Sequence, residues 1–320
     1  MRRLGRRLRV RGLAAASWLA CHLPERPLIA LAGLAGDAWY RATPDRAAQA
    51  RRNLARVVTW LAANDRGTPL AQAAARDPRA LERLVRLAYR HAARYYLEVM
   101  RTPAIAGAEL PRRITIETPE TVEDAFSPAR PAIFVGLHFG AIELPALYLA
   151  SRVGEAVGPM ETLDDPDLQA WFVRSRGSVG LRIVGLREAR RELTAALRAG
   201  TYVGLVGDRD LTGGGTLTDL FGAPARLPLG PALLAIETGA PAYVAAVRRA
   251  TPGRYIGRLE NVDVAMQGSR RERATATTAS IARAFERVIA DAPEQWWAVF
   301  FPIWPDLAPV GPASGPDTAT

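Results

Sequence analysis

Apolar residues in the first hundred positions recur at the spacing of amphipathic helices. This pattern covers residues 45–62 and residues 73–100, and we predict a helix over each range. Pro103 and the turn-rich residues up to Pro111 end this helical section. In the second helix, the apolar positions that share one face are Leu81, Leu84, Val85, Ala88, Ala92, Tyr95 and Val99.

From residue 113 onward, short apolar runs alternate with helical stretches. This alternation predicts an α/β fold, a central and mostly parallel sheet covered by helices, with a helical N-terminal layer that faces a membrane. Residues 208–229 are expected to form a long loop, because they hold three consecutive glycines. The predicted strands are Ile114–Glu117, Ala132–Leu137, Ala156–Met160, Leu181–Val184, Tyr202–Val206, Ala242–Val247 and Tyr255–Leu259, and the predicted helices cover 141–152, 165–179, 186–197, 231–238 and 272–290.

The N-terminal segment is strongly basic. The first twelve residues carry six arginines and no acid, and two apolar runs follow, at Leu13–Leu23 and Leu28–Gly36. Neither run reaches the roughly 20 residues that span a bilayer. We predict a basic amphipathic hairpin over residues 1–40 that lies on an anionic membrane. The alternatives are a signal peptide, against which His22 interrupts the apolar core, and helices that only cap the core.

No linker divides the rest of the chain. Residues 41–305 are therefore expected to form one domain, and residues 306–320, made mostly of Pro, Gly, Ala and Thr, a disordered tail.

Composition narrows the chemistry. The 320 residues include one cysteine and three histidines, so an internal disulfide is excluded and a His- or Cys-rich metal site is not expected. The formal net charge is +10 and every basic residue is arginine, which favours an anionic partner. Cys21 and His22 are adjacent, so on a helix their side chains point about 100° apart and cannot act as a nucleophile pair. His91 lies among arginines on a helix and is not favoured as catalytic.

His138 is the strongest catalytic candidate. It follows the apolar run 132–137, where a buried strand ends and a helix begins, and such strand ends carry the sites of open α/β sheets. A histidine oriented by a carboxylate can deprotonate a hydroxyl. Two acids compete for that role, Glu143 at the start of the next helix and Asp208 at another strand end. Asp208 is preferred, because Glu143 can instead stabilise the helix N-terminus. A capping or core histidine is the structural alternative.

Other charged residues form candidate substrate-binding groups. Arg209 and Asp210 accompany Asp208 at its strand end, and Arg226 precedes a helix that opens at Gly230-Pro231, an arrangement suited to an anion. Arg174 and Arg176 on the 165–179 helix could bind phosphate, although a solvated helix face is an equal alternative. Glu161, just after the 156–160 strand, completes this candidate set.

Several motifs together resemble a known family. The sequence lacks Gly-x-Ser-x-Gly, a Walker loop and Gly-x-Gly-x-x-Gly, which weakens the common hydrolase, NTPase and dinucleotide interpretations. His-Phe-Gly-x-x-Glu at 138–143 resembles the His-x4-acid motif of glycerolipid and lipid A acyltransferases. Across residues 20–305 the resemblance extends to the bacterial lipid A acyltransferase branch, which includes phosphatidylinositol mannoside acyltransferases. Its further motifs are Arg51-x-Asn53-Leu54, Arg174-x-Arg176, Gly207–Asp210, Phe221-Gly222-x-Pro-Ala, Gly230-Pro231 and Pro293–Trp297.

The resemblance implies an enzymatic activity and a cellular location. It implies transfer of a fatty acyl group from acyl-CoA or acyl carrier protein to a sugar hydroxyl of a glycolipid, at the cytoplasmic face of the inner membrane. It implies no metal, no cofactor beyond the co-substrate, and no nucleic-acid partner. His138 would be the base, held by Asp208, whereas Glu143 replaces a commoner Asp. A phosphatidylinositol mannoside is the expected acceptor, because the chain lacks the transmembrane anchor usual in lipid A enzymes. The alternatives are a late lipid A (Kdo2-lipid) acyltransferase, a thioesterase and a non-catalytic lipid-binding protein.

Overall fold

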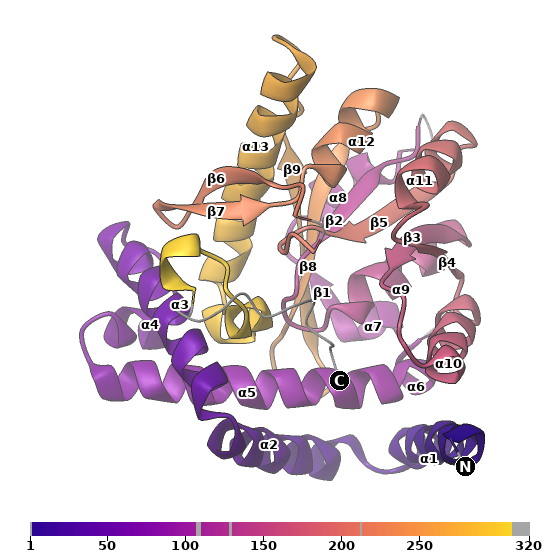
Figure 1. The fold of residues 1–320 in the computed structure, drawn as a ribbon, viewed down its shortest axis with the longest axis vertical. Helices are drawn as coiled ribbons and strands as arrows, with labels where there is room; N and C mark the ends of the chain where they lie inside the picture. The colour runs from indigo at the N-terminus through magenta and orange to yellow at the C-terminus, as the bar shows by residue number, and fades with distance from the viewer. Residues whose placement is uncertain (1, 107–109, 128–129, 212, 309–320) are drawn as a thin grey trace.

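A seven-stranded sheet forms the centre of the protein (Figure 1). The computed structural model describes residues 2–106, 110–127, 130–211 and 213–308. Every neighbouring pair of strands is parallel except β8 and β9, so the predicted mostly parallel sheet is confirmed. In spatial order the strands are β1 (Ile114–Ile116), β9 (Tyr255–Val262), β8 (Ala242–Arg249), β2 (Ile133–Gly136), β5 (Tyr202–Val206), β3 (Ala156–Met160) and β4 (Leu181–Gly185).

Helices cover both faces of the sheet. Successive side chains of a strand point to opposite faces, so Ile133 and Val135 enter one core while Phe134 enters the other. The second core is closed mainly by α8 (Pro119–Ala125) and α9 (Glu143–Val153), together with the short helices α6 (Thr102–Ile105) and α7 (Leu110–Arg113). The first core lies under α3 (Pro44–Ala63), α4 (Pro69–Ala74), α5 (Pro78–Met100), α11 (Ala189–Arg198), α12 (Gly230–Thr238) and α13 (Arg270–Ala290).

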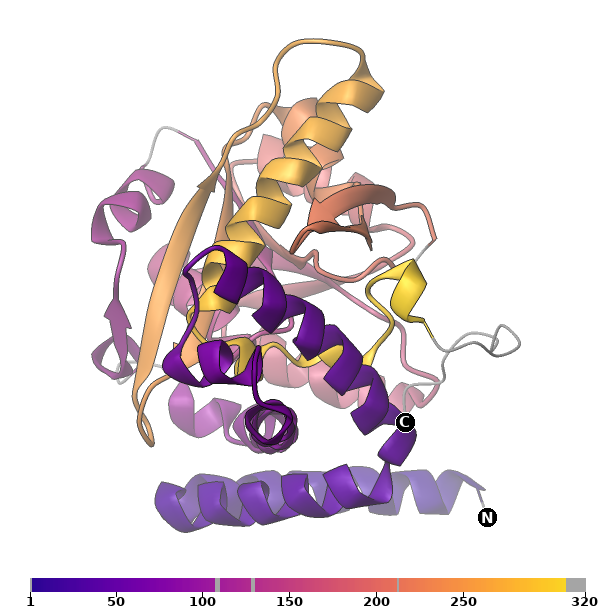
Figure 2. The same ribbon diagram turned by 90° about the vertical axis from the view of Figure 1, so that its left-hand side faces the viewer.

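The first two helices form a layer along one end of the molecule (Figures 1 and 2). α2 (Glu25–Ala42) packs along α5, while α1 (Arg2–His22) contacts the end of α5 and α10 (Pro166–Gly177). Gly36 permits the close approach, because a Cβ there would lie 2.7 Å from the Arg90 Cα. Asp37 then accepts two hydrogen bonds from Arg90, at 2.8 and 2.7 Å. The expected hairpin is wrong, since each helix packs on α5 rather than on the other.

The 73–100 helix and the 208–229 loop also differ from their predicted form. The helix expected over 73–100 is two helices, because Pro78 begins α5 and the Asp77 side chain caps it by accepting from the Arg79 N–H at 2.9 Å. The loop expected over 208–229 contains a hairpin of β6 (Thr216–Leu220) and β7 (Ala223–Leu227). Its two turn residues, Phe221 and Gly222, have φ values of 52° and 72°, as the two-residue turn of a twisted hairpin requires.

The C-terminal segment returns to the centre of the molecule. Beyond α13 it forms three short 3-10 helices, η1 (Pro293–Gln295), η2 (Trp297–Phe300) and η3 (Pro305–Leu307). Asn53 of α3 is fully buried, and its side-chain amide donates to the carbonyls of Val299 and Phe301 at 2.9 and 2.8 Å. Of the predicted tail, Asp306 pairs with Arg56, and residues 309–320 lie outside the described residues.

Candidate active site

His138 and Asp208 meet where two neighbouring strands end. β2 and β5 are paired in parallel, and the pairing continues one step beyond them, since the Gly207 N–H donates to the Gly136 carbonyl at 2.9 Å. The carboxyl ends of both strands therefore lie at the same edge of the sheet. His138 Nδ1 lies 2.6 Å from Asp208 Oδ1, and the His138 backbone N–H donates to Oδ2 at 2.8 Å. The contact preferred from the sequence is present.

Asp208 lies in a buried and fully hydrogen-bonded position. Only 1% of the residue is exposed, and Trp296 Nε1 adds a third hydrogen bond, to Oδ2, at 2.8 Å. Burial alone would raise the pKa of Asp208, but the charge and hydrogen bonds of His138 and the Trp296 bond outweigh it and lower the pKa below 3.8. The carboxylate is therefore ionised at neutral pH and stabilises positive charge on the imidazole.

The other imidazole nitrogen is left available for chemistry. A carboxylate at Nδ1 selects the tautomer protonated there, so Nε2 carries the lone pair. No hydrogen bond reaches Nε2 from the described residues, and 17% of the His138 side chain is exposed. The pair can therefore accept a proton from a hydroxyl that reaches this edge of the sheet.

Glu143 does not contact the imidazole. It is the first residue of α9, and its carboxylate accepts two hydrogen bonds from Arg176 of α10, at 3.1 and 2.6 Å. The alternative in which Glu143 orients His138 is wrong, because Asp208 already occupies Nδ1 and Glu143 faces α10. The Arg176 guanidinium is likewise engaged by this pair, which ties the start of α9 to α10.

The remaining candidates are distributed around the site. Arg174 and Glu161 are exposed and have no ion pair among the described residues. Arg226, exposed on β7, donates to the Gly215 carbonyl at 3.2 Å, and Asp210 accepts from the Gly215 N–H at 2.7 Å. Both contacts hold the loop that leads into β6. The Arg209 guanidinium lies 3.5 Å from the centre of the Phe301 ring. Their predicted role in substrate binding stays a prediction.

Trp296 and Trp297 are site residues that the sequence arguments left without a role. The segment before η2 runs beside the loop that carries His138. Phe139 and Trp296 form an isolated antiparallel β-bridge. The backbone N–H of Gly140 donates to the Gln295 carbonyl, and the backbone N–H of Trp297 donates to the His138 carbonyl. The Trp297 ring meets His138 edge-on with centroids 4.5 Å apart. Their position in the recognised Pro293–Trp297 motif was the available signal.

Comparison with known proteins identifies the family of this chain. A family model described as bacterial lipid A biosynthesis acyltransferase matches residues 12–302. The chain belongs to the bacterial lipid A biosynthesis acyltransferase family. Two relatives are phosphatidylinositol mannoside acyltransferases. The one from Mycolicibacterium smegmatis is 31% identical over 231 residues, 71% of this chain and 70% of the relative. The one from Mycobacterium tuberculosis is 33% identical over 198 residues, 60% of this chain and 58% of the relative.

Membership makes the protein an acyltransferase and confirms the resemblance read from its motifs. In this acyltransferase, His138 of the His-x4-acid motif and Asp208 of the Gly207–Asp210 motif form one hydrogen-bonded pair, while the last residue of the first motif, Glu143, pairs elsewhere. Asn53 of the N-terminal motif anchors the C-terminal segment, which in turn supplies Trp296.

Proposed function

We propose that this acyltransferase moves a fatty acyl group from an acyl thioester, acyl-CoA or acyl carrier protein, to a sugar hydroxyl of a phosphatidylinositol mannoside. The observation that carries the proposal is the His138–Asp208 pair with its available Nε2. It is supported by two relatives that are named phosphatidylinositol mannoside acyltransferases. A buried, ionised carboxylate behind an imidazole is the arrangement that activates a hydroxyl.

The reaction needs one base and no covalent enzyme intermediate. His138 Nε2 takes the proton from the acceptor hydroxyl as its oxygen attacks the thioester carbonyl carbon. The new C–O bond forms, the tetrahedral intermediate collapses, and the C–S bond breaks. The imidazolium then returns the proton to the leaving thiolate, so ester and free thiol are the products. Asp208 stabilises the transient imidazolium and keeps Nε2 facing the acceptor.

We further propose that α1 and α2 rest on the cytoplasmic face of an anionic membrane. The two helices and the turn between them expose Trp18, Leu19, Leu23, Leu31 and Leu34, and each of these residues is at least 47% exposed. An apolar face beside an arginine-rich segment suits a phospholipid surface. No helix in the described ranges is both long and apolar enough to cross a bilayer.

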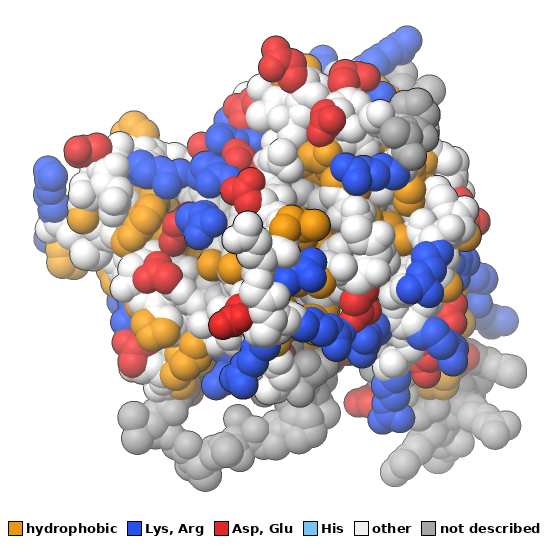
Figure 3. All heavy atoms as spheres, turned by 90° about the horizontal axis from the view of Figure 1, so that it is seen from above, with side chains coloured by type: hydrophobic (Ala, Val, Ile, Leu, Met, Phe, Trp, Pro, Cys, Tyr) orange, Lys and Arg blue, Asp and Glu red, His pale blue; other side chains and the backbone are white. Residues whose placement is uncertain are grey.

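The opposite end of the molecule has a different charge pattern. Figure 3 shows that face, where arginine and carboxylate side chains are interspersed. Arg190 and Arg270, for example, both pair with Glu237. Mixed charge offers no attraction to an anionic surface, which supports docking through α1 and α2.

One assay separates this proposal from its alternatives. The protein is incubated with acyl-CoA, with and without phosphatidylinositol mannoside, and both free thiol and acylated glycolipid are measured. We expect thiol release that depends on the acceptor and matches the ester formed. Release without acceptor would indicate a thioesterase, and no release would indicate a lipid-binding protein. In a parallel sample the acceptor is a Kdo2-lipid. Acylation of that lipid, without acylation of phosphatidylinositol mannoside, would assign the acceptor to lipid A synthesis.

A further inference from the structure

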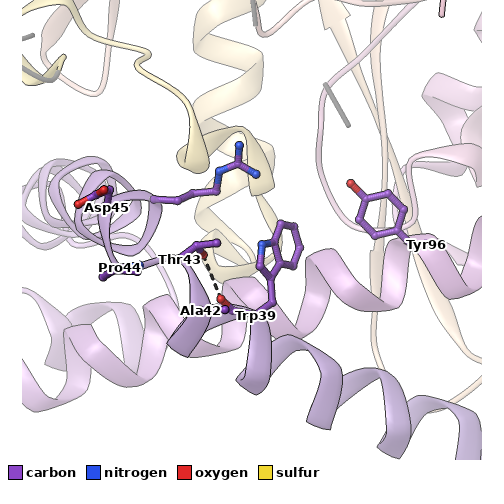
Figure 4. Close-up of a pocket in the computed structure, with 7 residues that line it drawn as sticks. Trp39, Ala42, Thr43, Pro44, Asp45 and Tyr96 are labelled. Carbon is purple, nitrogen blue, oxygen red and sulfur yellow. Dashed lines mark hydrogen bonds between the residues drawn. The ribbon is translucent and has the colours of Figure 1, made fainter. Parts of the chain in front are cut away.

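A cavity of about 700 Å³ lies between the end of α2, the start of α3 and α5. Its walls include Trp39 and Thr43, then Asp45 and Arg46, and Tyr96 of α5. Figure 4 shows the rings of Trp39 and Tyr96 rising from their helices toward the same open space, with Asp45 at the far edge. None of these side chains has a part in the proton transfer described above.

The cavity offers unpaired donors and flat apolar surfaces. Arg46 is exposed, and no carboxylate of the described residues pairs with it; its guanidinium lies 5.6 Å from the Phe301 ring centre. Trp39 Nε1 and the Tyr96 hydroxyl also lack hydrogen-bond partners in the described part of the chain. An arginine suits a phosphate oxygen, and aromatic rings can pack on the C–H face of a sugar.

Two chains of contacts connect the cavity with the catalytic pair. Arg46 and Arg209 both contact the ring of Phe301, and Arg209 follows Asp208 directly. On the other side, Tyr96 lies next to Tyr95, with ring centres 5.2 Å apart. Tyr95 stacks on Trp297 at 5.1 Å, and Trp297 meets His138 at 4.5 Å. A ligand in the cavity therefore lies a few side chains from the base.

We infer that this cavity holds the phosphorylated sugar head group of the glycolipid acceptor, with Arg46 on its phosphodiester and Trp39 and Tyr96 against a ring. The inference rests on the proposed function and adds the subsite that selects the acceptor. α2 supplies both the cavity wall and the exposed Leu31 and Leu34, so the cavity lies next to the surface from which a membrane lipid would enter.

Charge favours the acceptor over the donor as the occupant. A lipid phosphodiester carries one negative charge, which a single free arginine can balance. Coenzyme A carries a pyrophosphate and a phosphomonoester. Among the described residues that line this cavity, Arg46 is the one arginine, and Asp45 adds a carboxylate. Arg46 can pair with one phosphodiester but not with the several phosphates of coenzyme A, so a singly charged, hydroxyl-rich ligand fits this cavity better.

Equilibrium binding tests the inference independently of acyl transfer. The probes are the water-soluble deacylated phosphatidylinositol mannoside, the same oligosaccharide without phosphate, and coenzyme A, each titrated by calorimetry into the full chain. Arg46→Gln should weaken binding of the phosphorylated head group by about tenfold or more. It should leave the phosphate-free sugar and coenzyme A unchanged. Arg46→Lys keeps the positive charge but loses the planar guanidinium, so its affinity for the phosphorylated head group should lie between those of wild type and Arg46→Gln.

Arg83→Gln is the matched control, because Arg83 is an exposed arginine of α5 outside the cavity. Head-group binding that is equal in wild type, Arg46→Gln and Arg83→Gln would overturn the inference. So would a loss of coenzyme A binding in Arg46→Gln, which would make the cavity a donor site. Head-group binding that depends on Arg46 without any acyl transfer would instead count against the proposed function alone.

Discussion

Asp208 holds His138 at two points, with Oδ1 2.6 Å from Nδ1 and Oδ2 2.8 Å from the backbone nitrogen of the same residue. One carboxylate thereby fixes both the imidazole and the loop that carries it. The third hydrogen bond, from Trp296, completes the arrangement and makes the carboxylate depend on the C-terminal segment.

Trp296→Phe should slow the reaction without weakening substrate binding. The change removes the indole donor from Asp208, so the pKa of Asp208 rises and its support of the imidazolium weakens. We expect kcat to fall about tenfold with KM nearly unchanged, since a charged hydrogen bond contributes roughly 1.5–3 kcal/mol. Steady-state kinetics measures both.

Trp304→Phe provides the matched control for that change. Trp304 is also fully buried, but its indole donates to the Leu220 carbonyl instead. Both variants lose a similar volume and one hydrogen bond, so only Trp296→Phe should slow the chemistry. Equal losses of kcat would mean that packing, and not support of Asp208, explains the effect.

Glu143→Gln should affect stability more than chemistry. Its carboxylate pairs with Arg176, whose side chain is 19% exposed, so the change leaves a mostly buried guanidinium without its counter-charge. We expect a loss of about 1–3 kcal/mol in the free energy of unfolding, less than for a fully buried pair. Urea unfolding and kinetics on the same samples distinguish the effects. A collapse of kcat at unchanged stability would return Glu143 to the catalytic pair.

The strand-end positions are what made His138 and Asp208 predictable together. Both follow apolar runs that form strands, and parallel neighbours place their carboxyl ends at one edge. The run before His138 is buried as its pattern predicts, whereas in β5 only Val203 is buried and Val206 is 43% exposed. Whether β2 and β5 are neighbours is a long-range property that no local pattern encodes. The same limit hid Trp296, since its contact with Asp208 joins residues 88 positions apart.

The missed hairpin has a local cause. β6 and β7 do alternate, with Thr218, Leu220, Ala225 and Leu227 buried. Consecutive glycines before them favoured a loop, and the turn places Phe221 at a positive φ that glycine or asparagine usually adopts. Tertiary contacts stabilise it, because the Phe221 N–H donates to Glu286 at 2.5 Å and its ring packs on Trp60.

His91 should make the fold sensitive to acid. Burial, with Arg249 and Arg94 nearby, lowers the pKa of His91 to about 3. The unfolded chain has a His pKa near 6.5 and therefore binds a proton that the folded state does not. Stability is then present above pH 6.5 and lost as pH falls toward 3. Between pH 7 and pH 5, wild type should lose about 2 kcal/mol more than His91→Gln in urea unfolding. If the free energies of unfolding of wild type and His91→Gln change equally with pH, the folded protein protonates His91 as readily as the unfolded chain does, and the prediction is wrong.

Membrane binding should depend on the N-terminal layer. Deleting residues 1–12 removes six arginines, each of which contributes about 1 kcal/mol near an anionic surface. Co-sedimentation with anionic vesicles should fall, and high salt should weaken the intact protein similarly. Trp18→Ser with Leu31→Ser and Leu34→Ser should weaken binding even at high salt. Replacing Arg190 and Arg270 by Gln, at the opposite end, should change nothing; equal loss there would point to nonspecific charge attraction.

The most direct test of the account is a double-mutant cycle of His138→Ala and Asp208→Asn, measured as kcat/KM for acyl transfer from acyl-CoA to phosphatidylinositol mannoside. His138→Ala should lower the rate by about 10²–10⁴-fold, the usual contribution of a general base. Asp208→Asn should also lower it by orders of magnitude, and the double variant should be little worse than His138→Ala, because the two groups act as a unit. Losses that multiply independently, or activity within a few-fold of wild type in folded His138→Ala protein, would contradict the catalytic pair.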